Sequence, residues 1–127
     1  MEKQELEDKL YHYRAKVIKV TDGDTVVMEV DLGYYGTTRQ IHRIIQDDGF
    51  YFDTPETRKY RGVTDEHKAH GIEAKERAVE LLLDQDVYIK CYKRGSFRWL
   101  AEIWLDDGRM YSEIMINEGF QKRDDYK

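Results

Sequence analysis

Residues 11–31, YHYRAKVIKVTDGDTVVMEVD, form a hairpin pattern that decides the fold. Before the turn residues TDGD, period-two alternation predicts a strand with one face formed by Tyr11, Tyr13, Ala15 and Val17. After the turn, residues 25–31 alternate in the same way and predict a second strand, with a common face formed by Val26, Met28 and Val30. Two alternating runs around a glycine-containing turn are typical of an antiparallel hairpin.

Three more strands are predicted outward from this hairpin. A second turn, GYYG at 33–36, leads into an alternating run from Thr38 to Ile45. Residues 50–64 are expected to form an irregular loop that contains the only proline of the chain. Runs at 87–92 and 99–105 then predict strands four and five.

Two helices are predicted between and after these strands. Thr64 or Asp65 is a suitable N-cap for a long helix. Helical periodicity gives this helix an apolar stripe of Ala69, Ile72, Val79, Leu82 and Leu83. Residues 112–118 predict a short capped helix that ends at Gly119.

The order of three strands, a helix, two strands and a short helix predicts a mainly β (α+β) fold, a five-stranded OB barrel. The first helix would lie between strands three and four, and residues 1–10 would form a charged helical lead-in. A length of 127 residues predicts a single domain over 1–127.

Composition narrows the setting of this domain. Cys91 is the only cysteine, so the chain cannot form an intramolecular disulfide. We also expect the protein to be a monomer. No apolar run approaches the roughly 20 residues of a membrane span. The acidic start, MEKQELED, lacks the apolar stretch of a signal peptide, so a cytoplasmic location is expected.

The net charge of −5 points away from a passive nucleic-acid binder, which normally carries a basic surface. Positive charge is local instead, in one group at Arg58, Lys59 and Arg61 and another within residues 90–98. An acidic protein can still act on a polyanion when a metal ion offsets part of the repulsion.

Three acidic residues fall where strand ends meet. Asp24 enters the second strand, and Asp53 and Glu56 bracket Thr54-Pro55 in the loop after the third. Two carboxylates, a backbone carbonyl and waters make a hard-oxygen site suited to calcium. One cysteine and four scattered histidines do not suggest zinc. Taken singly, Asp-Gly-Asp and Asp-Thr-Pro-Glu are also ordinary turn sequences.

The ordered set is more specific than its parts. Three blocks resemble the signatures of the thermonuclease (staphylococcal nuclease) family, namely Asp22-Gly23-Asp24-Thr25, Asp53-Thr54-Pro55-Glu56 and Arg98-Trp99-Leu100-Ala101. Residues 112–119 resemble the family's next helix, and the similarity runs from about Tyr13 to Phe120.

The resemblance implies a calcium-dependent nuclease that cleaves DNA and RNA at the 5′ P–O bond and leaves 3′-phosphates. Asp24 and Asp53 would bind Ca²⁺ with the carbonyl oxygen of Thr54. Glu56 would be the general base that activates water, and Arg98 would bind the phosphate. Arg58 and Tyr126 are further candidates for substrate contact, although a frayed C-terminal tail is the alternative for Tyr126.

The chain departs from the family pattern at the second arginine, which usually lies five residues before the aspartate of the second block. Asp48 occupies that position here, and residues 46–52 contain an apparent insertion. Arg39 and Arg43 share one face of the third strand, and we predict Arg43 as the second phosphate clamp with Arg39 on the rim. The alternatives are that the clamp is lost, that Arg39 or Arg58 takes over its role, or that the added acidic residues oppose it. A second departure is Phe97, where the family commonly has glycine.

Two other classes of function compete with a nuclease. One is a non-catalytic OB module that binds nucleic acid, like the degenerate domains of Tudor staphylococcal-nuclease proteins, which usually lack the acidic metal ligands. The other is a protein-interaction domain, suggested only by ten tyrosines and the net acidity. Retention of Asp24, Asp53, Glu56 and Arg98 together favours the nuclease.

Overall fold

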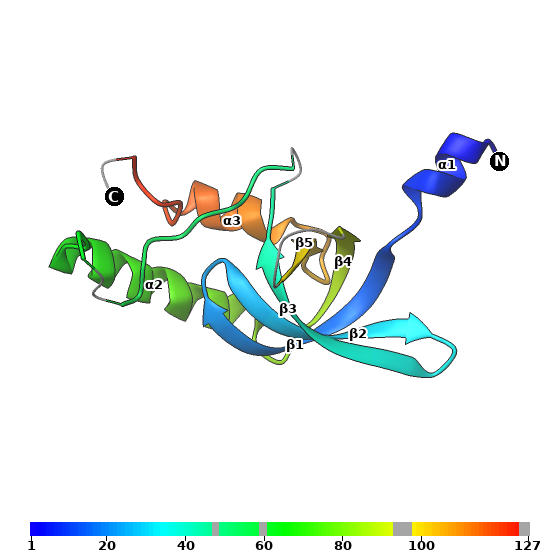
Figure 1. Ribbon diagram of the computed structural model, residues 1–127, viewed down its shortest axis with the longest axis horizontal. Coiled ribbons are helices and arrows are strands. Elements are labelled where there is room, and N and C mark those ends of the chain that lie inside the picture. The colour runs from blue at the N-terminus through cyan, green and yellow to red at the C-terminus, as the bar shows by residue number, and fades with distance from the viewer. Residues whose placement is uncertain (47–48, 59–60, 93–97, 125–127) are drawn as a thin grey trace.

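The computed structural model describes residues 1–46, 49–58, 61–92 and 98–124 (Figure 1). Five strands close into a barrel in the order β1-β2-β3-β5-β4, so the predicted OB barrel is confirmed. The strands are β1 His12–Asp22, β2 Thr25–Gly33, β3 Gly36–Ile44, β4 Asp86–Tyr92 and β5 Trp99–Trp104. The helices are α1 Lys3–Asp8, α2 Asp65–Leu82 and α3 Tyr111–Asn117.

The position of β3 between β2 and β5 organises one side of the barrel. β2 and β3 run antiparallel, and Thr25 is the partner of Arg43. β3 and β5 run parallel, and Arg43 is also level with Leu100. The start of β2, the end of β3 and the start of β5 therefore lie side by side.

Most of the predicted inward residues of the first hairpin form the core. Val26, Met28 and Val30 of β2 are buried as expected, as are Ala15 and Val17 of β1. A register shift between Val17 and Lys19 then changes which residues of β1 face inward, so Val20 is the next buried residue.

The prediction was wrong for Tyr11, which precedes β1 and is 61% exposed. Its φ of 64° lies in the left-handed region, so the chain turns there instead of continuing the strand.

Helix α2 begins at the predicted cap. The hydroxyl of Thr64 accepts a hydrogen bond from the backbone N–H of His67 at 3.1 Å.

The predicted apolar stripe of α2 was wrong at three of its positions, whereas Leu82 is buried and Leu83 packs against the core as expected. Ala69, Ile72 and Val79 are exposed. The buried face instead consists of His67, Gly71, Ala74, Ala78 and Leu82. A Cβ atom on Gly71 would stand 2.1 Å from the carbonyl oxygen of Glu56, so the helix backbone lies directly against the loop before it. Small residues fit this close contact, and they carry little hydrophobic signal in a sequence.

Helix α2 covers one end of the barrel, and the β2–β3 hairpin extends from the opposite end (Figure 1). Helix α1 lies apart from the barrel with all its residues exposed, in agreement with a charged lead-in. Across the described ranges, no helix is both long and apolar enough to cross a membrane.

We expect Gly71→Ala to lower the free energy of unfolding by about 1–3 kcal/mol, because the added methyl group would meet the fixed backbone of Glu56. At an open helix position the same change would stabilise by about 1 kcal/mol. Urea unfolding measures the difference, with Glu73→Ala on the exposed face of α2 as a near-neutral control. A Gly71→Ala protein as stable as the unmodified chain would contradict this close contact.

Candidate active site

Asp24, whose carboxylate is buried, connects its own turn with the end of β3 and with the loop at Thr54. Its Oδ2 accepts a hydrogen bond from the backbone N–H of Thr54 at 3.0 Å, and its Oδ1 accepts one from the hydroxyl of Thr25 at 2.9 Å. Its backbone carbonyl accepts the N–H of Ile44 at 2.9 Å. Burial raises the pKa of Asp24, and the nearby guanidinium of Arg43 opposes that rise.

Hydrogen bonds from two other segments hold the turn that carries Asp24. The fully buried Tyr111 of α3 donates its hydroxyl proton to the carbonyl of Gly23 at 2.5 Å. The hydroxyl of Thr57 donates to Asp22 Oδ1 at 2.8 Å. Gly23 is required for space, since a Cβ atom there would stand 2.7 Å from Cγ2 of Thr54.

The chain folds back on itself after β3, in the region where an insertion is predicted. Ile45 pairs with Tyr51, and the N–H of Phe52 donates to the carbonyl of Ile44 at 3.2 Å. Asp47 and Asp48 lie outside the described residues. Because the chain folds back onto β3, the next residue, Asp53, emerges beside Arg43.

Arg43 lies between the two aspartates. Its Nη2 is 3.5 Å from Asp24 Oδ2 and forms a close ion pair with Asp53 Oδ1. The same nitrogen is 3.4 Å from the carbonyl oxygen of Phe52, and the guanidinium lies over the ring of Tyr51 at 5.2 Å from its centroid.

Arg39 has a different environment. Further back along β3, it forms an exposed ion pair with Glu29 at 3.0 Å. Of the two candidate arginines on this face, Arg43 is the one in contact with the aspartates.

Glu56 is held by its backbone and lies beside a lysine. Its N–H donates to Nε2 of the buried His67 at 2.8 Å, so this ring nitrogen acts as an acceptor. Its Oε1 is 3.5 Å from Nζ of Lys122, and the N–H of Lys122 donates to the carbonyl of Asp53 at 2.8 Å. The segment after α3 therefore runs alongside Asp53 and Glu56.

The remaining predicted residues lie further out. Arg98 is exposed just before β5, and alternation along the chain puts it on the same side as Leu100, the partner of Arg43. Arg58 lines a depression against the outer face of α2, with Ile72 and Val79. Tyr126 and Phe97 lie outside the described residues.

Sequence reasoning missed three supporting residues, His67, Lys122 and Tyr111. Each contacts a part of the chain that lies outside its own helix or segment, so no local pattern marks it. Nothing in the sequence around Lys122 indicates that its ammonium group lies beside Glu56.

The oxygen donors around Arg43 suit a hard cation. Within the described ranges, no three residues of the His, Cys, Asp and Glu types gather into a metal cluster. Asp24 and Asp53 nevertheless contact one and the same guanidinium nitrogen, so a single positive centre can serve both carboxylates. Calcium would complete its coordination with backbone carbonyl oxygen and water.

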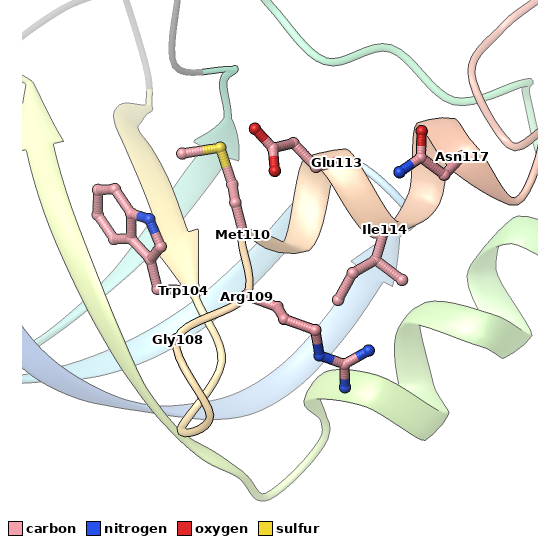
Figure 2. Close-up of a pocket in the computed structure, with 7 residues that line it drawn as sticks. All are labelled: Trp104, Gly108, Arg109, Met110, Glu113, Ile114 and Asn117. Atoms are coloured by element: carbon pink, nitrogen blue, oxygen red, sulfur yellow. The ribbon is translucent and has the colours of Figure 1, made fainter.

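A separate depression lies beside α3, with a volume of about 470 Å³; Figure 2 shows the residues that line it. Trp104 and Met110 form part of its wall, and the charged groups of Arg109 and Glu113 point away from each other. None of its described lining residues belongs to the predicted site, so this depression is distinct from the Asp24–Asp53 site.

Comparison with known proteins identifies a family for this chain. A family model described as "Staphylococcal nuclease homologue" matches residues 50–126, more than half of the chain. The matched part includes the Asp53–Glu56 block and Arg98, whereas Asp24 and Arg43 precede it. No curated protein matches the chain.

The geometry predicts unequal effects for the two arginines. Arg43→Met leaves the buried carboxylate of Asp24 without its nearby cation and should lower the free energy of unfolding by about 1–3 kcal/mol. Arg39→Met removes an exposed pair and should change it by about 0.5 kcal/mol or less. Urea unfolding at neutral pH in chelator measures both.

The double variant Arg43→Met with Asp24→Asn provides the control for this comparison. The neutral carboxamide can accept the N–H of Thr54 through its oxygen and donate its NH2 to the hydroxyl of Thr25, so it should restore most of the stability lost in Arg43→Met. Equal effects of the two arginine substitutions would contradict this placement of Arg43.

Proposed function

Because the chain belongs to the staphylococcal nuclease homologue family, we propose that it is a calcium-dependent nuclease that hydrolyses phosphodiester bonds of DNA or RNA. The observation that carries the proposal is the convergence of Asp24 and Asp53 on Arg43. Two carboxylates that can bind a metal ion and a guanidinium that can bind phosphate, next to a candidate base at Glu56, are the groups that phosphodiester hydrolysis requires.

The proposed calcium ligands are Asp24, Asp53 and the carbonyl oxygen of Thr54. The buried carboxylate of Asp24 supports this assignment, because a cation next to it would offset the cost of holding its charge away from water. When bound, calcium would supply positive charge beside the phosphate oxygens.

Glu56 is the proposed general base. It accepts a proton from water while the water oxygen bonds to phosphorus, and the bond to the 5′ oxygen breaks. The products are a 3′-phosphate and a 5′-hydroxyl, which takes its proton from solvent. His67 and Lys122 restrict the base, one through the backbone N–H of Glu56 and the other through its carboxylate.

Arg43 and Arg98 are the proposed phosphate clamps. Charge builds on the phosphate oxygens in the transition state, and a guanidinium presents paired donors that match two such oxygens. The ion pairs of Arg43 already hold its side chain at the carboxylates. Arg98 approaches from β5, the strand next to β3.

One observation favours a second function, a non-catalytic module that binds nucleic acid. Arg43 already pairs with both Asp24 and Asp53 and offsets one of their two negative charges, so both carboxylates have a cationic partner without a metal ion. Release of acid-soluble nucleotides that depends on calcium separates the two functions, since only a nuclease produces it.

Calcium should stabilise the unmodified chain and fail to stabilise Asp24→Asn or Asp53→Asn, because each substitution removes one of two carboxylate ligands. At a calcium concentration of 100 times Kd, the expected gain is about 2.7 kcal/mol. Thermal unfolding with and without calcium measures it, and Asp107→Asn is the control, because Asp107 is an exposed aspartate paired with Arg109. An identical calcium response in all four proteins would rule out this site.

Glu56→Gln should lower kcat by about 10²–10⁴-fold with little change in KM, because the amide keeps the size of the side chain but cannot accept the proton. Cleavage of an oligonucleotide in saturating calcium measures both constants. Glu66→Gln is the matched control, because Glu66 is an exposed glutamate on α2 whose carboxylate pairs with Arg123. If KM rose sharply while kcat survived, Glu56 would be a binding residue.

A further inference from the structure

The end of the barrel opposite α2 holds a cavity that the proposed active site does not use. Its volume is about 510 Å³, within the range of small-ligand sites. All five strands contribute to its lining, which includes Tyr13, Val30, Gln40, His42, Cys91 and Trp99. Alanines and a leucine of α2 pack into the core from the other end. The helix therefore leaves this mouth open.

The lining combines aromatic rings with uncharged polar groups. Tyr11, Tyr13, Tyr92 and Trp99 provide the rings. Gln40 and Thr38 provide an amide and a hydroxyl, which hydrogen-bond to each other at 2.9 Å.

His42 contributes a neutral ring to the cavity. Its Nδ1 lies 3.0 Å from the carbonyl oxygen of Gln40, which can only accept, so Nδ1 carries the proton and Nε2 is an acceptor. Burial lowers the pKa of His42, which keeps the ring uncharged at neutral pH. No described lining residue then carries a charge at neutral pH. A flat, uncharged aromatic group with hydrogen-bonding edges fits such a lining.

The cavity and the proposed phosphate site lie on opposite faces of β3 and β5, and the two faces meet where the pairing of these strands begins, at His42 and Trp99. On β3, His42 faces the cavity and the next residue, Arg43, contacts Asp24 and Asp53. On β5, Trp99 lines the cavity and follows Arg98 directly. Trp99 is paired with His42 across the two strands. In a nucleotide only a sugar separates the phosphate from the base, so one strand of nucleic acid can reach both the arginines and the cavity.

We propose that this mouth of the barrel binds an unpaired base of the nucleic acid, next to the phosphate held by Arg43 and Arg98. The proposal rests on the proposed nuclease function, because it takes the nucleic acid from that function. Aromatic rings stack on any base, so the subsite accepts different sequences. A base held in a duplex cannot enter the cavity, so single strands are the favoured substrate.

Fluorescence of Trp99 tests the subsite without catalysis. The chain has two tryptophans, so Trp104→Phe leaves Trp99 as the only reporter. In chelator, single-stranded hexathymidylate should quench this fluorescence to saturation. An abasic oligonucleotide with the same number of phosphates should not, because it has charge but no base. An absence of quenching by hexathymidylate, or equal quenching by the abasic chain, would overturn the proposal.

Affinity gives a second, independent measurement. Trp99→Ala should raise the Kd for hexathymidylate in chelator by roughly 5- to 150-fold, the effect typical of losing one base–aromatic stack. Trp99→Phe should recover most of the affinity, since phenylalanine also stacks. Tyr88→Ala is a matched control, because Tyr88 is 43% exposed and Trp99 is 39% exposed, and Tyr88 lies outside the cavity. Equal losses in Trp99→Ala and Tyr88→Ala would refute the subsite.

Two substrates separate this inference from the proposed function. In calcium, Trp99→Ala should lower kcat/KM for hexathymidylate much more than for bis(4-nitrophenyl) phosphate, a phosphodiester without a base. Failure of the unmodified chain to hydrolyse either substrate, together with quenching of Trp99 in Trp104→Phe, contradicts the nuclease and supports the subsite. Hydrolysis of both substrates by the unmodified chain, without any response of Trp99 in Trp104→Phe, supports the nuclease and overturns the subsite.

Discussion

The buried carboxylate of Asp24 is the interaction on which the rest of the site depends. Two segments donate backbone N–H groups to Asp24. Ile44 at the end of β3 donates to the backbone carbonyl of Asp24, and Thr54 in the loop donates to its carboxylate. A charge held away from water is costly unless it is paired. The guanidinium of Arg43 meets that need, and its ion pair with Asp53 places the second carboxylate beside the first.

Close packing of α2 extends this organisation to Glu56. The helix lies so near the loop that only glycine fits at position 71, and His67, four residues earlier, accepts the N–H of Glu56. The same helix fills one end of the barrel with small residues of its buried face. A single rigid element therefore supports both the core and the loop that carries the proposed base, as functional sites require.

The parallel pairing of β3 and β5 gives this side of the barrel two different surfaces. Successive side chains of a strand point to opposite faces, so charged residues and cavity residues alternate along the same short segments. Arg43 and His42 on β3 follow this rule, as do Arg98 and Trp99 at the start of β5. Because of this alternation, arginines lie on one face of these strands and a neutral, aromatic cavity lies on the other, although the chain as a whole has a net charge of −5.

The sequence by itself determined the order of strands and helices, the turns, a helix cap at Thr64 or Asp65 and the acidic blocks, because turn chemistry and periodicity act between near neighbours. Only the tertiary structure decided which arginine meets the aspartates, since that depends on how the chain after Ile45 folds back. It also decided which face of α2 is buried, because close backbone contact selects glycine and alanine over larger apolar residues. The partners of Glu56 were also decided by the tertiary structure, because they come from α2 and the C-terminal segment. Contacts between segments that are distant in the sequence leave no local pattern in it.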